Sequence, residues 1–475
     1  MSVQKLMPVL GLYTAFIPVL TFASDKTVAP SFYGGRGFSQ GDTPETPSAI
    51  EYQRRALAPP IIVETIIDVP STVKLNRPPL SATNSSQTVE LDLSRLTRND
   101  WLLAKKSMYY FDLNYHPETG FWDSVQGYHH TTMWDIASGI SATLASYELN
   151  LISREEVRDK LSLTLDTLAT IALYQNTLPN REYSTKHGKP SGSYSDTKSN
   201  GNGWSALDIG RLLIWLRITE KMLPELASKV AIIEKNWKLA SAVHKGTLYG
   251  TKLYKNKEYY RQEGRLGYLQ YAAQGFELFG YNLAQSFTKQ HVEKVSVDGM
   301  SVYVDNRNVP YFTTDPYVLT AIEIGAKNVW WNQLDQLYQL HKKRSKQLGQ
   351  PQVFAEDAMS KSPWFAYNNI YYYGKPWLSV SPGGKPIENP QTFSSKIGFG
   401  LSVLYTDDFS QQLYNTVVKT SLSSRSIPTG RYKNGGTNTA YNINTNSLVL
   451  TALWYKALGN HALYPYALEQ SNSAK

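Results

Sequence analysis

The chain has 475 residues, of which 41% are hydrophobic and 18% charged, so it can bury a large core and does not have the composition of a disordered protein. Its formal net charge of +9 suits an anionic partner, but no run of five Lys or Arg residues supports a nucleic-acid-binding arm. The absence of cysteine excludes disulfides, thiolate metal sites and a cysteine nucleophile.

The first 23 residues are typical of a cleavable signal peptide. Lys5 precedes an apolar run from Leu6 to Phe22, and Thr21-Phe22-Ala23 offers small residues at the two positions that cleavage requires. An uncleaved membrane anchor is the alternative, because the run approaches the length that spans a bilayer. We expect an exported protein that is periplasmic or secreted.

Residues 24–98 are rich in Pro, Gly, Ser and Thr, which is typical of a linker or an extended arm. One β-branched run within them, Pro60 to Asp68, predicts a short strand. Residues 99–470 then form the main domain.

Helices dominate from Trp101 onward, and half-exposed helices alternate with densely apolar ones. Loops of twenty or more residues precede several of the apolar helices, and such long loops are usually functional. The predicted helices are Trp101–Leu113, Trp134–Leu151, Arg154–Leu173, Trp204–Ile218, Leu226–Val243, Leu266–Phe279, Tyr317–Ala326, Val329–Gln347, Ile397–Leu404, Phe409–Leu422 and Asn446–Leu458.

Three loops resemble one another, because each places an aromatic residue and an Asp or Asn shortly after a Gly. They begin at Gly120, Gly192 and Gly430, and each precedes an apolar helix. Such self-similarity predicts helix pairs that must stack on each other to bury their apolar faces. We expect a mainly α fold in which helical hairpins close into a ring, with the long loops at one mouth.

Several motifs of this chain resemble the six-hairpin glycosidase superfamily. They are Thr131–Gly139 (Thr-Thr-Met-Trp-Asp-Ile-Ala-Ser-Gly), Gly203–Leu213, Gly264–Tyr268 and Thr314–Tyr317. The chain is similar over roughly 101–468, most of all to an exported bacterial family of unassigned function related to the glucoamylase-like and endo-β-1,2-glucanase group. The resemblance implies an (α/α)6-type toroid and sugar-polymer chemistry in its central cavity.

Hydrolysis of a glycosidic bond needs two carboxyl groups, one protonated and one ionised. Asp135, which follows Trp134 at the start of an apolar helix, and Glu263, near several tyrosines, form the predicted catalytic pair. Asp135 could instead cap its helix together with Thr132, and Glu263 could be a loop charge paired with a neighbouring arginine.

Asp208 and Asp315 are the next candidates. Capping or a helical pair with Arg211 is the favoured role for Asp208, and Asp315, which precedes Pro316, has the features of a helix cap. The neighbouring acids at 356–357 are expected in a solvated loop.

Flat rings and one guanidinium are predicted to contact a sugar, although each ring alone is more typical of core or loop packing. Adjacent histidines, His129 and His130, point in different directions, and no His pair at helical spacing completes a metal site, so no metal or cofactor is predicted. The predicted substrate-binding residues are Trp134, Trp122, Tyr194, Trp204, Arg211, Tyr268, Tyr317 and Tyr432.

The sequence therefore predicts an exported glycoside hydrolase that acts on a bacterial polysaccharide, either an exopolysaccharide or a periplasmic glucan, by carboxylate acid/base chemistry. One alternative is a non-catalytic polysaccharide-binding accessory in contact with an envelope machinery for polymer synthesis or export. A second alternative is a polysaccharide lyase on an anionic glycan, which the positive net charge suits and which needs a Tyr or His base beside Arg or Lys.

Overall fold

The computed structural model describes residues 89–307, 311–325 and 329–473, all within one structural unit. The predicted signal peptide (1–23) and the predicted strand (60–68) lie outside these residues, as does most of the predicted arm at 24–98. No helix in the described ranges is long and apolar enough to cross a bilayer.

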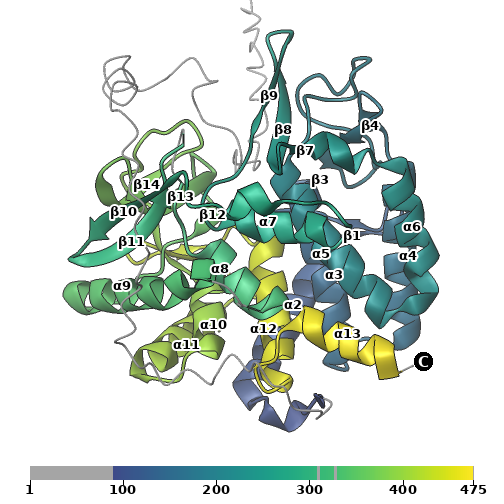
Figure 1. Cartoon of the computed structure of the whole chain (residues 1–475). Helices are drawn as coiled ribbons and strands as arrows, with labels where there is room; N and C mark the ends of the chain where they lie inside the picture. The colour runs from purple at the N-terminus through teal and green to yellow at the C-terminus, as the bar shows by residue number, and fades with distance from the viewer. Residues whose placement is uncertain (1–88, 308–310, 326–328, 474–475) are drawn as a thin grey trace, which may run out of the picture. The chain divides into compact units, whose positions relative to one another are not determined.

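The described chain is mainly helical, which confirms the predicted fold class at that level (Figure 1). Every predicted helix has a counterpart, and a C-terminal helix is added. The α-helices are α2 (Arg98–Asn114), α3 (Met133–Glu148), α4 (Arg154–Thr170), α5 (Ala206–Met222), α6 (Ala227–Asn236), α7 (Tyr268–Glu277), α8 (Asp315–Leu319), α9 (Gln333–Leu348), α10 (Ser395–Leu404), α11 (Asp408–Ser421), α12 (Ile443–Ala457) and α13 (Leu463–Ser473).

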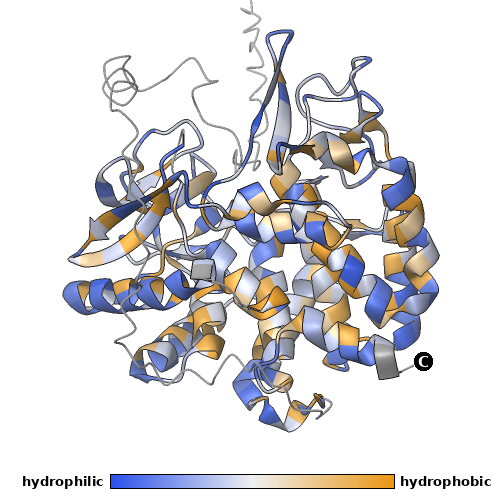
Figure 2. Ribbon diagram, in the orientation of Figure 1, coloured by the Kyte–Doolittle hydropathy of each residue, from blue (hydrophilic) through white to orange (hydrophobic). Residues whose placement is uncertain are grey.

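Six of these helices contact one another in a closed series. Helix α3 packs against α5, α5 against α7, α7 against α8, α8 against α10, α10 against α12, and α12 again against α3. Others cover this series: α4 lies on α3, α6 on α5, α11 on α10 and α2 on α12. The covering helices α4 and α6 alternate hydrophilic and hydrophobic turns, as half-exposed helices do (Figure 2).

Small residues let the buried helices approach closely. A Cβ added to Gly275 of α7 would lie 1.9 Å from the carbonyl oxygen of Gly210 in α5. A Cβ on Gly139 of α3 would lie 2.2 Å from the Trp122 ring. Because interiors are close-packed, these glycines fix the separation of their neighbours.

Antiparallel strands occupy much of the chain that was expected to be loop. The ladders are β1-β2, β3-β6, β4-β5, β7-β8-β9, β10-β11, β12-β13-β14 and β15-β16-β17. Hairpin β8-β9 projects beyond the helices, and β10-β11 lies over α9 (Figure 1). The strands are β1 (Tyr115–His116), β2 (Phe121–Trp122), β3 (His130–Thr131), β4 (Leu173–Tyr174), β5 (Leu178–Pro179), β6 (Tyr183–Ser184), β7 (Val243–His244), β8 (Thr247–Tyr254), β9 (Lys257–Gln262), β10 (Val292–Val297), β11 (Met300–Asp305), β12 (Glu356–Ala358), β13 (Phe365–Tyr372), β14 (Lys375–Val380), β15 (Gln391–Ser394), β16 (Gly430–Tyr432) and β17 (Thr437–Asn438).

The structure contradicts several predictions about local structure, two of them in these parts of the chain. The single helix expected at 226–243 is broken, because α6 ends at Asn236 and a separate 3-10 turn follows at Leu239–Ala242. Glu356 and Asp357 do not lie in a solvated loop, since both are buried in strand β12.

Candidate active site

A small pocket lies at the N-terminal ends of the six helices that form the closed series. Its volume is ≈ 10 Å³, which is room for about one water molecule. Helices α3, α5, α7, α8, α10 and α12 all contribute side chains to it, most of them from their first two turns. The lining residues are Trp134, Arg211, Tyr268, Asp315, Leu319, Lys396, Ile397, Asn444 and Leu448.

Only Asn444 among these lining residues is partly exposed; the others are buried. Asn444 is therefore the lining residue that is most accessible to solvent. Because N-terminal turns carry partial positive charge, their convergence favours negatively charged groups in the pocket.

Asp135 lies outside the pocket and is linked to it by a hydrogen bond to the lining residue Asn444. Its Oδ2 accepts hydrogen bonds from the backbone N and the hydroxyl of Thr132, at 3.2 and 2.9 Å, so the predicted cap of α3 is present. Its Oδ1 accepts a hydrogen bond of 2.8 Å from Nδ2 of Asn444. One carboxylate thus caps α3 with one oxygen and contacts a lining residue with the other.

Asn444 connects this carboxylate to a guanidinium. Its Oδ1 accepts hydrogen bonds from the Ser138 hydroxyl at 2.8 Å and from Arg211 at 3.3 Å. The Arg211 guanidinium lies 4.6 Å from the centre of the Trp134 ring and 3.4 Å from the Glu323 carboxylate. Burial raises the pKa of Glu323, and the Arg211 charge opposes that effect.

Asp315 does not cap its helix as predicted. The N-cap of α8 is Thr314, and Asp315 accepts a hydrogen bond of 3.0 Å from the backbone N of Glu356. Its other oxygen lies 2.7 Å from Nζ of Lys396, which also lies 3.5 Å from Oδ1 of Asp357. A buried lysine therefore joins two buried aspartates at one side of the pocket.

Burial raises the pKa of Asp357 to about 7, and the nearby Asp315 charge adds to the rise while Lys396 opposes it. Because the pKa is higher in the folded state than in the unfolded state, the folded chain retains this proton over a pH range in which the unfolded chain has lost it. The contribution of Asp357 to the free energy of unfolding should therefore fall as pH rises from about 4 to about 7.

Asp357→Asn should remove this part of the pH dependence. The variant should gain stability relative to the wild type at pH 8 but not at pH 4, because asparagine cannot ionise. Urea unfolding of both proteins at the two pH values measures the difference. An equal effect of the substitution at both pH values would contradict the assignment.

Glu263 and Asp208 are buried beside α5 and do not line the pocket. Glu263 lies 3.4 Å from the Arg181 guanidinium and accepts a hydrogen bond from the backbone N of Ala206, the first residue of α5. Burial raises its pKa, and Arg181 opposes the rise. Asp208 is in the first turn of the same helix, where its backbone N donates to the Ser205 hydroxyl at 3.3 Å.

Two of the predicted aromatic residues, Trp134 and Tyr268, line the pocket and contact each other edge to face, with ring centres 5.7 Å apart. Trp122 and Tyr317 belong to the core, since they are 1% and 0% exposed. The structure therefore brings together Trp134, Arg211, Tyr268 and Asp315 of the predicted residues, with Asp135 directly behind them.

The remaining predicted rings lie in other parts of the chain. Trp204 packs on Tyr174 and Tyr260 and donates to a backbone carbonyl of β8 at 3.1 Å. The Tyr194 hydroxyl accepts a hydrogen bond of 3.3 Å from the backbone of Asn256 at the tip of β8-β9. The Tyr432 hydroxyl contacts that of Ser360 at 2.9 Å.

Sequence reasoning missed Lys396 and Asn444. A signal for Lys396 exists, because it is the one charged residue in the apolar stretch 394–404. Asn444 stands among the asparagines at 442, 444 and 446, where Asn442 caps α12 and only the middle one faces the pocket. Nothing in the sequence distinguishes that middle asparagine.

Solved structures share this fold at low sequence identity. A proposed glucoamylase from Bacteroides caccae aligns with a TM-score of 0.55 and 11% identity, over 78% of this chain and 98% of that chain. An endo-β-1,2-glucanase from Chitinophaga pinensis, in complex with sophorotriose and glucose, gives 0.53 and 13% over 78% and 97%. An endo-β-1,2-glucanase from Talaromyces funiculosus, in complex with sophorose, gives 0.51 and 11% over 79% and 86%.

These similarities confirm the predicted resemblance at the level of the fold. No curated protein matches the sequence. Residues 102–459 match the family described as "Protein of unknown function (DUF3131)". Since that match covers most of the chain, the protein belongs to this family.

Proposed function

We propose that this protein is an exported glycoside hydrolase that cleaves a glucan or a related bacterial polysaccharide in the pocket around Asp315 and Asn444. The observation that carries the proposal is the convergence of six helix starts on one pocket that holds a carboxylate, two aromatic rings and two cationic side chains. Glucanases with the same fold support the choice of substrate class.

The closed series of helix contacts supports an (α/α)6-type toroid built from residues 99–470. In this arrangement α3, α5, α7, α8, α10 and α12 form the inner ring, and the pocket lies at its centre. The loops that precede these helices form the mouth of the toroid. The polysaccharide enters there, beside Asn444.

Asp315 is the proposed carboxylate that activates water, and its nearest cation is the Lys396 ammonium at 2.7 Å. Asp135 is the proposed proton donor, and it would reach a bound sugar when the Asn444 amide, which now donates to its Oδ1 at 2.8 Å, moves aside. The water-sized space beside Asp315 suits the water that hydrolysis consumes. Trp134 and Tyr268 are buried and form the apolar wall of the pocket.

Asp135→Asn tests this proposal against a matched control. Asp135 and Asp100 have the same local role, since each closes a capping box with a threonine three residues earlier, but Asp100 caps α2 outside the pocket. We expect Asp135→Asn to lower the release of reducing ends from linear β-1,2-glucan by roughly 10²- to 10⁴-fold. Asp100→Asn should keep the wild-type rate.

A series of other glucans and bacterial exopolysaccharides extends the assay if β-1,2-glucan is not cleaved. Binding of a glycan without turnover would favour the non-catalytic accessory role. An Asp135→Asn variant that is as active as the wild type would contradict the proposed mechanism.

A polysaccharide lyase is the second candidate, and the cationic lining of the pocket favours it. A uronate carboxylate would compete with Glu323 for Arg211 and with Asp315 for Lys396, and Tyr268 would act as the base. A lyase releases an unsaturated product with an ultraviolet chromophore, and a hydrolase does not. Absorbance during incubation with uronate polymers therefore separates the two reactions.

A further inference from the structure

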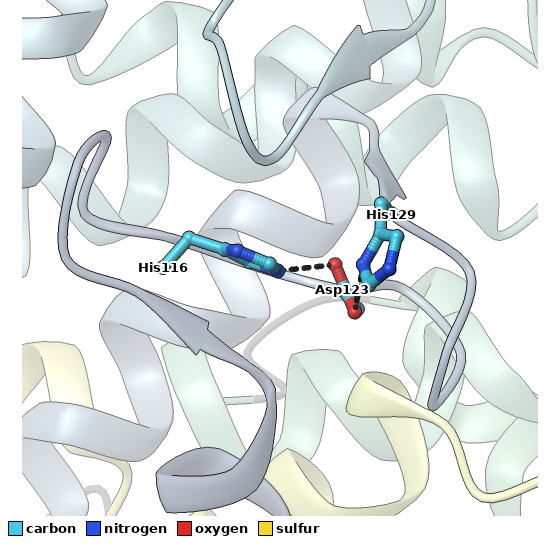
Figure 3. Close-up of side chains that lie close together, drawn as sticks. All are labelled: His116, Asp123 and His129. Carbon is cyan, nitrogen blue, oxygen red and sulfur yellow. Dashed lines mark hydrogen bonds and ion pairs between the residues drawn. The ribbon is translucent and has the colours of Figure 1, made fainter.

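Two histidines converge on one buried carboxylate at a point separate from the pocket. His116 Nε2 lies 2.8 Å from Oδ1 of Asp123, and His129 Nδ1 lies 3.0 Å from Oδ2 of the same residue. Figure 3 shows the two rings approaching Asp123 from different sides. The three potential ligand atoms all lie within 4.8 Å of one another.

We propose that His116, Asp123 and His129 form a binding site for a divalent transition-metal ion, for which Zn²⁺ is the best-fitting ion. Two imidazole nitrogens and a carboxylate oxygen are ligands that Zn²⁺ accepts, with bonds of about 2.0–2.2 Å. Ligand atoms around a tetrahedral ion then lie roughly 3.3–3.6 Å apart, so the two His–Asp contacts must widen by about half an ångström and the two histidine nitrogens must settle at a similar separation. Water completes the coordination.

The backbone holds these three side chains in place. Strands β1 and β2 pair His116 with Phe121, and the backbone N of Asp123 donates to Asn114 at 3.1 Å. The backbone carbonyl of His129 accepts a hydrogen bond of 3.1 Å from Thr185. The ligands are therefore positioned by contacts that do not depend on an ion.

Neighbouring groups also orient the carboxylate. The Thr185 hydroxyl donates to Oδ1 of Asp123 at 2.6 Å, as groups behind a metal ligand commonly do. Asp123 is 3% exposed and His116 15%, whereas His129 is 44% exposed. An ion can thus enter from solvent on the His129 side and reach a largely enclosed site.

The proposed metal site would link the first turns of α3 and α12, both of which contribute residues to the pocket. His129 lies three residues before Thr132, the cap of α3. Ser124, next to Asp123, accepts a hydrogen bond of 3.0 Å from the backbone N of Ile443, the first residue of α12. A bound ion would fix this loop and thereby stabilise the starts of α3 and α12, which carry Asp135 and Asn444.

Calorimetric titration of the untagged full chain with Zn²⁺ at pH 7.5 tests the proposal. We expect saturable binding of one ion per chain, and His116→Ala and His129→Ala should each weaken the affinity at least about tenfold. His244→Ala is the matched control, because it removes an exposed histidine outside the cluster and should leave Zn²⁺ affinity unchanged. Ca²⁺, which prefers oxygen ligands, should not compete.

Two further readouts exclude a purely structural explanation. Zn²⁺ should raise the melting temperature of the wild type and of His244→Ala but not that of His129→Ala. Co²⁺ in place of Zn²⁺ should give visible absorption bands that disappear in His129→Ala. Absence of saturable Zn²⁺ binding to the wild type, or equal binding by a folded His129→Ala variant, would overturn the proposal whether or not the chain cleaves glycans.

Discussion

Asp315→Asn should reduce glycan hydrolysis by roughly 10³-fold while leaving the chain folded. The substitution keeps the size of the side chain but removes the negative charge that lies 2.7 Å from Lys396. An amide cannot activate water or attack a sugar, so the loss should appear in kcat. Initial rates of reducing-end release, together with circular dichroism of the variant, measure both parts of the prediction.

Asp408→Asn is the control for this experiment. Asp408 is also the first residue of its helix, α11, but it is exposed and outside the pocket. It should retain the wild-type rate. If Asp315→Asn were active at more than about a tenth of the wild-type rate, Asp315 would not be a catalytic carboxylate.

Gly275→Ala should destabilise the protein by at least about 2 kcal/mol. In an ordinary exposed helix the same change would stabilise by about 0.5–1 kcal/mol, because alanine loses less backbone entropy on folding. Here the new Cβ would lie 1.9 Å from the carbonyl oxygen of Gly210, so α7 must move away from α5. The cost of that repacking outweighs the helical gain.

Urea unfolding monitored by circular dichroism measures this effect. Gly383→Ala is the control, since its new Cβ would meet nothing closer than 3.7 Å and should change the stability little. A Gly275→Ala variant as stable as the wild type would show that α5 and α7 are less tightly packed than the structure indicates.

The helices were predictable because burial on one side of a helix imposes a period that the sequence displays. The predicted start and end of α3, for example, lie within three residues of the observed Met133–Glu148. The strands were not predicted. In Thr247–Tyr254 glycine and lysine interrupt the apolar pattern, and the turn that follows uses Lys255 and Asn256 at positive φ instead of a glycine.

The site residues that could be predicted are those that lie next to a sequence signal for the start of a helix. Trp134 and Asp315 follow threonines at helix starts, and both reach the pocket. Glu263 also lies beside a helix start, but its carboxylate is held by Arg181 and by α5. The direction of a side chain depends on contacts between distant segments, and a single sequence does not contain them. For the same reason, the sequence does not reveal that His116 and His129 lie close together.

The first two turns of six helices line the pocket, and several of their lining residues also belong to the core. The loops that precede these helices can therefore vary during evolution while the helices keep their packing. Chains that share 11–13% identity can then retain one architecture with different residues around the pocket. Grafting loops and first turns between such relatives should transfer selectivity, and the helical framework should tolerate the graft.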